Sequence, residues 1–155
     1  MNWLIVKTAF RKEPYVTTAL NRMGLTAWHP VQVIACRPAI ARRVSSKAHL
    51  ATYRELPILP RRVFVTGPAI MDRELQSELR TLRYVDGIET GMDQQLVQIP
   101  DGQISAFRAV VEAENTASLA LVQARSRKQK AKWRSLKDAL LEMVESAKNQ
   151  MEQAA

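Results

Sequence analysis

Apolar and polar positions near the start of the chain predict a strand, a helix and a second strand, in that order. Residues 2–9 are short, apolar and rich in β-prone side chains, which is typical of a buried central strand. Residues 11–23 carry apolar side chains at helical spacing, and Gly24 directly after them is a natural C-terminal cap. Residues 25–36 predict a second strand, with Pro30 at an edge or a bulge because proline cannot donate to a sheet ladder.

The middle of the chain predicts the remaining elements of one domain. Residues 37–54 lack sustained periodicity and carry basic side chains without an acid, so we interpret them as a basic loop or hairpin arm. Residues 62–66 predict a third strand, residues 71–82 a helix, residues 95–99 a fourth strand, and residues 103–113 a further helix. The βαββαβ order predicts an antiparallel sheet with helices on one face, an α+β fold of the ferredoxin-like type.

The chain changes character from residue 117 onward, where glycine and proline are absent and good helix formers dominate. A dense basic run comes first. Apolar residues then recur at helical spacing, at Leu136, Leu140, Met143, Ala147 and Met151. We therefore predict a domain over residues 1–115 and a basic, then amphipathic, helical tail over residues 116–155. The amphipathic part can dock on its own domain, self-associate or lie in a partner's groove.

Two prolines, Pro57 and Pro60, bracket the apolar pair Ile58 and Leu59 just ahead of the third strand. Because proline cannot donate to a ladder, this segment must lie at the start of a strand or at the edge of the sheet. We expect the apolar pair to face outward and to form a docking surface, in preference to a plain core role.

Composition narrows the class of partner and the compartment. The 155-residue chain has a net charge of +8 and a pI near 10.1, which favours DNA, RNA or an acidic protein face as partner. Cys36 is the only cysteine, so no intrachain disulfide can form, and no apolar run approaches the ~20 residues of a membrane span. We expect a soluble cytoplasmic protein with no membrane partner.

The sequence offers little for catalysis. His29 and His49 are far apart and poor in neighbouring ligands, and Cys36 does not complete a metal site. No Ser/His/Asp or Cys/His set is recognisable, and no glycine-rich phosphate loop occurs. We predict no catalytic, cofactor-binding or metal-binding residues and no enzymatic activity. A small acylphosphatase-like hydrolase ranks last, because the loop after the first strand lacks glycines.

Several short motifs follow one another over residues 1–114. They are Trp3-Leu4-Ile5-Val6-Lys7-Thr8, Arg11-Lys12-Glu13 with Ala19-Leu20 and Gly24, Trp28-His29-Pro30, Pro57-Ile58-Leu59-Pro60-Arg61-Arg62-Val63-Phe64-Val65, Gly87-Ile88, and Ile99-Pro100 with Ile104. In this order they resemble the NusG N-terminal domain family of transcription elongation and antitermination factors.

The resemblance implies a partner and a docking surface. Domains of this family dock on the clamp helices of the largest catalytic subunit of bacterial RNA polymerase through an apolar pocket on the sheet, and they suppress pausing. The positions that match or adjoin this pocket here are Ile58, Leu59, Arg62 and Phe64. Arg62 replaces the family's usual tyrosine, and because a buried unpaired arginine is costly, we expect it to meet an acid on the partner.

Two further departures from the family change the expected function. Asp86 stands ahead of Gly87-Ile88 where the family often has an arginine, which weakens one expected DNA contact. The basic helical tail stands in place of the family's C-terminal β-barrel, so we expect no ribosome or termination-factor coupling through a barrel. A stand-alone or specialised paralogue fits better than the housekeeping factor.

Basic side chains predict contacts with DNA and nascent RNA. The candidates are Arg11, Lys12 and Arg22 on the first helix, Arg37, Arg42, Arg43 and Lys47 in the arm, and Arg127, Lys128, Lys130 and Lys132 in the tail. A solvated surface is an equal alternative for the helix and the arm. Phe10 and Tyr15 are aromatic side chains near the first group that can stack on bases, but we assign both to core packing.

The competing function is an autonomous DNA- or RNA-binding module of ferredoxin-like fold.

Overall fold

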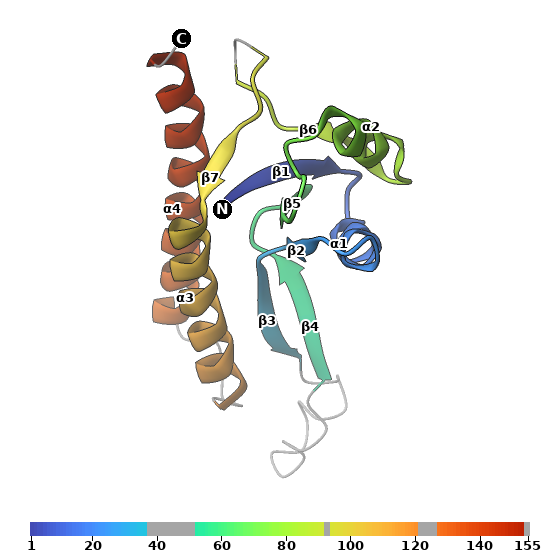
Figure 1. Cartoon of the computed structure of the whole chain (residues 1–155). Helices are drawn as coiled ribbons and strands as arrows, with labels where there is room; N and C mark the ends of the chain where they lie inside the picture. The colour runs from blue at the N-terminus through green and yellow to red at the C-terminus, as the bar shows by residue number, and fades with distance from the viewer. Residues whose placement is uncertain (37–51, 92–93, 121–126, 154–155) are drawn as a thin grey trace.

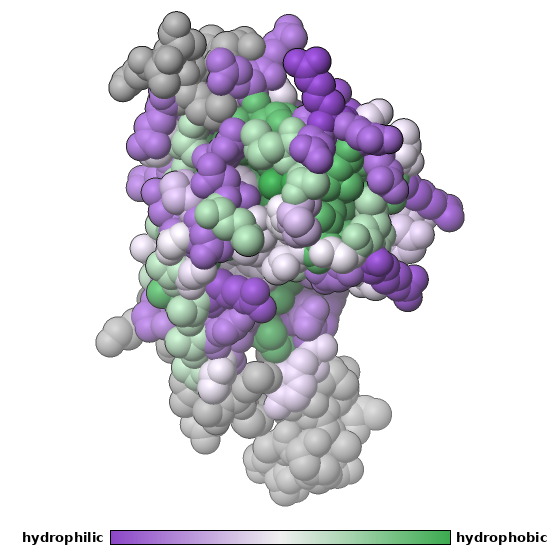
Figure 2. All heavy atoms as spheres, viewed as in Figure 1, coloured by the Kyte–Doolittle hydropathy of each residue, from purple (hydrophilic) through white to green (hydrophobic). Residues whose placement is uncertain are grey.

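The computed structural model describes residues 1–36, 52–91, 94–120 and 127–153 (Figure 1). Its described part is a mixed α+β fold with antiparallel sheets and four helices, which confirms the predicted α+β class. No helix in these described ranges is long and apolar enough to cross a membrane. In the space-filling view, hydrophobic side chains gather in the middle of the visible face, and hydrophilic side chains lie around them (Figure 2).

The larger sheet is organised around β1 (Asn2–Thr8), whose apolar run makes it the central strand, as predicted. On one side β1 pairs antiparallel with β5 (Arg62–Thr66), which in turn pairs with β2 (Thr26–Trp28). On its other side β1 pairs first with β7 (Gln98–Pro100) and then with β6 (Val85–Ile88). The strand order is therefore β2-β5-β1-β6, with β7 sharing the β6 side of β1.

The alternation of β1 divides the apolar core into two layers, because successive side chains of a strand point to opposite faces. Leu4 and Val6 face α1 (Glu13–Arg22) and α2 (Arg73–Thr81). Trp3 and Ile5 belong to the opposite layer, and the register Ile5↔Phe64 places Phe64 beside them.

That second layer is closed by two long helices, α3 (Asp101–Ala120) and α4 (Arg127–Gln153), which run side by side along the β7 flank (Figure 1). α3 is held at its start by the indole Nε1 of Trp3, which donates to Oδ1 of Asp101 at 2.7 Å. The helix extends past residue 113, where we predicted its end, and runs through residues 115 and 116, where we placed the boundary between domain and tail.

The predicted single strand over residues 25–36 is wrong, since it is divided between two sheets. β2 ends at Trp28, and β3 (Val31–Cys36) starts after Pro30 and pairs with β4 (Thr52–Pro57) in a separate hairpin. Pro30 has no N–H, but its carbonyl accepts from the backbone N of Ile58 at 2.8 Å. Proline thus marks the place where the chain leaves the larger sheet.

The free edge of β3 is covered by one side chain of α3. The amide of Asn115 donates from Nδ2 to the carbonyl of Val31 and accepts at Oδ1 from the backbone N of Val33, both at 2.8 Å. Asn115 therefore bonds the edge as a neighbouring strand would, which satisfies backbone groups that are otherwise open to pairing with another chain.

Candidate functional site

The sequence prediction that Ile58 and Leu59 face outward is wrong. Ile58 is 7% exposed, Leu59 is 1% exposed and Phe64 is fully buried, and all three belong to one core cluster with Trp3 and Ile5. We call these five residues the apolar sheet face. They lie on β1, on β5 and on the turn that leads into β5, where a docking pocket is expected, but in this structure another element covers them.

The covering element is α4. Its buried residues on the apolar sheet face are Trp133, Leu140, Met143, Val144 and Ala147. Of the three roles left open for the amphipathic tail, the structure shows docking on its own domain. Trp133, which follows the basic run of the tail in sequence, is only 6% exposed and packs in this cluster.

One ion-pair cluster fixes α4 to the sheet. Nζ of Lys148 lies 2.9 Å from Oε1 of Glu89, just after β6, and 3.2 Å from Glu145 on its own helix. The hydrogen bond to Glu89 is the main cause that raises the pKa of Lys148 above its usual value of 10.5. Both side chains of the Lys148–Glu89 pair are largely buried, so this contact is stronger than an ordinary surface pair.

Arg62 faces the same carboxylate from the sheet. Its Nε lies 3.8 Å from Oε2 of Glu89, too far for a hydrogen bond, and both atoms are buried without another partner. We expected Arg62 to meet an acid on a partner protein. In this structure the acid that it faces is Glu89 of its own chain, whose other oxygen is held by Lys148.

A second candidate surface lies where β1 ends and α1 begins. Phe10 and Tyr15 are 61% and 51% exposed, so the prediction that they are core residues is wrong. The ring of Tyr15 packs edge-on against Tyr84 with centroids 5.0 Å apart. Cations lie over these rings, with Arg11 5.0 Å from Phe10, and Lys12 and Arg83 4.8 and 4.7 Å from Tyr84. We call these six residues the cationic–aromatic corner.

The backbone at this corner is held in an unusual conformation. Arg11, Arg61 and Tyr84 have φ angles of 61°, 65° and 71°, in the left-handed region that non-glycine residues rarely adopt. The carbonyls of Arg61 and Tyr84 accept from the backbone N of Thr8 and Ala9, each at 2.9 Å, which fixes both turns to the end of β1. Such residues cost on the order of 1–3 kcal/mol each and cluster at functional sites, so the corner is a candidate site on backbone geometry as well as composition.

Arg61 is oriented by two acids. Its backbone N donates to Oε1 of the buried Glu13 at 2.6 Å, and its guanidinium Nη2 lies 3.0 Å from Oδ2 of Asp86. Asp86, which we expected to weaken a DNA contact, thus pairs with an exposed arginine of the same chain.

The structure brings together only some of the predicted nucleic-acid contacts. Arg11 and Lys12 lie together at the corner, whereas Arg22 is exposed in the last turn of α1, at the other end of that helix. Lys132 forms an ion pair with Glu114 of α3. Arg37, Arg42, Arg43 and Lys47 lie outside the described residues. Arg127, Lys128 and Lys130 lie in the first turn of α4.

Sequence reasoning missed Arg83 and Tyr84. The available signal was the basic–aromatic dipeptide itself, which lies in the turn between α2 and β6. Periodicity could not show that this turn lies beside the end of β1, because that proximity comes from the pairing of β6 with β1.

His29 lies between the sheet and α1. Burial lowers the pKa of His29 below its usual value of 6.5. The nearby carboxylates of Glu13 and Glu55 raise this pKa, but their effect is smaller than that of burial. Its Nδ1 lies 2.8 Å from Oγ1 of Thr17. Among the described ranges, no three His, Cys, Asp or Glu side chains are grouped as a metal site.

No protein-family model matches this chain, and a search of curated proteins finds no match.

Proposed function

We propose that this protein is a transcription elongation or antitermination regulator, similar to the NusG N-terminal domain family, that binds the clamp helices of bacterial RNA polymerase. One observation carries the proposal. Large apolar side chains from β1, β5 and the turn before β5 form one continuous sheet face, and a helix at the end of the chain covers it. Such a face becomes an apolar docking surface once the helix leaves.

The strand order supports the finer fold within this proposal. With the β3–β4 hairpin counted as an insertion, the remaining strands follow the order expected of a ferredoxin-like sheet, with β6 and β7 sharing the place of the fourth strand. α1 and α2 lie on one face, as that fold requires, and the proposed docking face is the other one.

Docking on polymerase and packing of α4 compete for the same side chains. Burial of a Leu, Val or Met side chain stabilises by roughly 1.5–3 kcal/mol, so α4 holds the face firmly through Leu140, Met143 and Val144. A partner displaces α4 only if it offers comparable apolar surface to the open form. The docked state described here is therefore the form with low affinity for polymerase.

The cationic–aromatic corner supplies the nucleic-acid contact in this proposal. Exposed Phe10 and Tyr15 offer ring surfaces on which single-stranded bases stack, and the neighbouring cations attract phosphates of the displaced DNA strand or of nascent RNA. The place of action is the cytoplasm, where bacterial polymerase works.

The test is co-elution of the full chain with bacterial core RNA polymerase at moderate salt. Leu140→Asp places a charge against the apolar sheet face and opens α4, and Lys148→Glu weakens the same contact more gently. Asn149→Asp introduces a carboxylate on the exposed side of α4 and is the matched control. Circular dichroism verifies that each variant is folded.

We expect weak co-elution of the wild type and the control. Both opened variants should bind polymerase with an apparent affinity about tenfold higher or more, because a larger fraction of the molecules has the apolar sheet face uncovered. Absence of binding by folded, opened variants would overturn the proposal.

A second candidate function is an autonomous single-strand-binding module, favoured by the cationic–aromatic corner alone. This function requires no polymerase. It predicts that the protein binds a thymidine oligonucleotide with the same affinity whether α4 is docked or open. Equal binding by wild type and Leu140→Asp, with no polymerase co-elution by either, would favour this alternative.

A further inference from the structure

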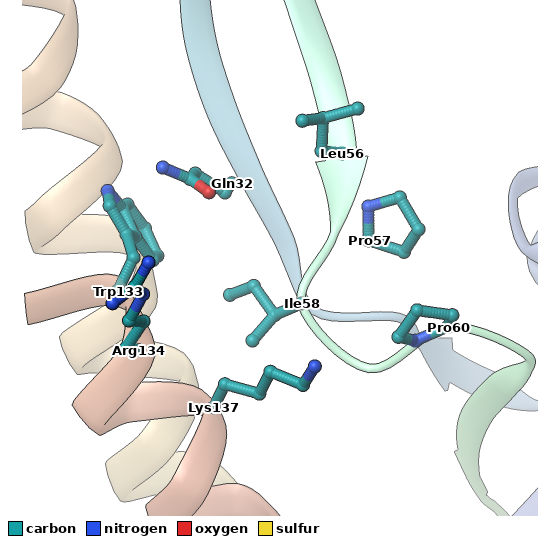
Figure 3. A pocket seen from close by; sticks show the side chains of 8 residues that line it. All are labelled: Gln32, Leu56, Pro57, Ile58, Pro60, Trp133, Arg134 and Lys137. Atoms are coloured by element: carbon teal, nitrogen blue, oxygen red, sulfur yellow. The ribbon is translucent and has the colours of Figure 1, made fainter. Parts of the chain in front are cut away.

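A cleft opens between α4 and the β4–β5 turn, beside the apolar sheet face (Figure 3). It encloses about 300 Å³ and is lined by Gln32, Leu56, Pro57, Ile58, Pro60, Trp133, Arg134 and Lys137. In Figure 3, Ile58 lies between the two walls, and the side chain of Lys137 extends from α4 toward the turn.

Apart from Gln32, the sheet-side wall of the cleft is apolar, and it is accessible. Leu56 is 40% exposed although it is a large aliphatic residue, and Pro57 and Pro60 extend the same surface. Proline rings are rigid, so this wall keeps its shape without a further loss of side-chain entropy when a ligand binds. The volume suits one or two apolar side chains.

The α4 wall supplies two cations at the mouth. Arg134 and Lys137 are exposed and lie three residues apart on the helix, so they are neighbours on its surface. Neither takes part in an ion pair among the described residues, in contrast to Lys132 and Lys148 on the same helix. No acidic residue lines the cleft. An apolar interior with an uncompensated positive rim is complementary to an apolar side chain flanked by carboxylates.

We propose that this cleft binds a short acidic–apolar segment of a partner protein. Such a segment places its apolar side chain against Leu56 and Pro60 and its carboxylates on Arg134 and Lys137. Nucleic acid fits less well, because Trp133, the only aromatic residue of the lining, is 6% exposed and offers no free ring face for a base.

One wall of the cleft comes from α4 and the other from the β3–β4 hairpin and the turn that follows it, so the cleft exists only while α4 is docked. A ligand that binds only this state stabilises it by mass action. The segment therefore locks α4 over the apolar sheet face. That this also lowers affinity for polymerase rests on the proposed function, whereas the binding itself does not.

The test uses a fluorescein-labelled hexapeptide with a central leucine–phenylalanine pair flanked on each side by two aspartates. Binding to the full chain is followed by fluorescence anisotropy. One control peptide carries serines in place of the apolar pair, and a second carries asparagines in place of the aspartates. The protein variants are Arg134→Glu and Lys137→Glu, and Arg80→Glu on α2 is the matched control with the same change in net charge.

We expect the peptide to bind with a Kd below about 1 mM. Each reversed rim charge should weaken binding by about fivefold, while Arg80→Glu should leave it within about twofold. Both control peptides should bind more weakly, and Leu140→Asp, which opens α4, should abolish binding whatever its effect on polymerase.

Three results would overturn the proposal. The first is absence of peptide binding. The second is binding of the serine peptide as tight as that of the leucine–phenylalanine peptide, which would indicate charge attraction only. The third is displacement of the peptide by a thymidine oligonucleotide in a manner that depends on Lys137. The last result would assign the cleft to nucleic acid. Polymerase co-elution is measured separately, so failure of this site and failure of the proposed function are distinguishable.

Discussion

Nζ of Lys148, five residues before the described end of α4, lies 2.9 Å from Oε1 of Glu89, the residue that follows β6. The pair joins the C-terminal helix to the sheet beside the residues that the family resemblance assigns to polymerase docking. In the proposed function, this pair adds a specific electrostatic contact to the apolar packing that holds α4 on the sheet.

Lys148→Glu should loosen α4 without removing any apolar contact. The substitution breaks the pair and places two carboxylates together, so we expect the free energy of unfolding to fall by about 1–3 kcal/mol, between the values for exposed and buried pairs. Urea unfolding measures this change. Lys132→Glu, which breaks the more exposed pair with Glu114, should cost less. An equal or greater cost for Lys132→Glu would contradict the assigned importance of Glu89.

Acidification should destabilise the protein through His29. Because burial holds the pKa of His29 below 6.5 in the folded state, the unfolded chain takes up a proton that the folded chain does not. Stability is therefore present above the unfolded pKa and is lost as pH falls below it. We expect the urea midpoint to fall between about pH 7.5 and about pH 5.5, and to fall less in His29→Gln. The same pH dependence in both proteins would assign the titration to other groups.

Asn115→Ala should expose the edge of β3. The substitution removes both hydrogen bonds of the side-chain amide, so the carbonyl of Val31 and the N–H of Val33 lose their partner on α3. We therefore expect the free energy of unfolding, measured by heat or urea, to fall by about 1–3 kcal/mol. Thr116→Ala is the control, since the Thr116 hydroxyl bonds only a carbonyl of its own helix. If the two variants are equally stable, the edge does not depend on Asn115.

Tyr15→Ala removes an exposed ring of the cationic–aromatic corner and should weaken binding of a thymidine oligonucleotide by roughly five- to a hundredfold, because one stacked base is worth about 1–3 kcal/mol. Arg11→Ala should instead reduce the slope of log affinity against log salt by about 0.7, the effect of one phosphate contact on a single strand. Tyr53→Ala, at an exposed tyrosine of β4, is the control. Loss of binding in Tyr53→Ala alone would move the site away from the corner.

The sequence could predict the elements whose signal is local. The apolar run of β1, the helical spacing in α1 and α2, and the amphipathic pattern of α4 all correspond to elements of the structure. The sequence did not predict β6, because Asp86 and Gly87 interrupt its apolar pattern. β6 forms a strand because it pairs with β1, and the register of this pairing shifts between Lys7 and Thr8. Its formation depends on a neighbour that local periodicity does not identify.

The candidate site was predictable only in part for the same reason. Apolar periodicity indicates that Leu140 and Ala147 need a partner surface, and the prolines indicate that Ile58 and Leu59 lie at a sheet margin. Neither pattern indicates that these two surfaces meet each other. The corner likewise joins Tyr15 and Tyr84, residues far apart in the chain, through tertiary packing that composition does not encode.

Hydrogen–deuterium exchange of the full chain, alone and bound to bacterial core RNA polymerase, tests most directly whether polymerase replaces α4. We predict that backbone amides of α4 around Leu140 and Val144 lose protection in the complex, while amides of the central strand β1 keep theirs. A complex in which α4 keeps its full protection would contradict the claim that the apolar sheet face is the polymerase-binding surface.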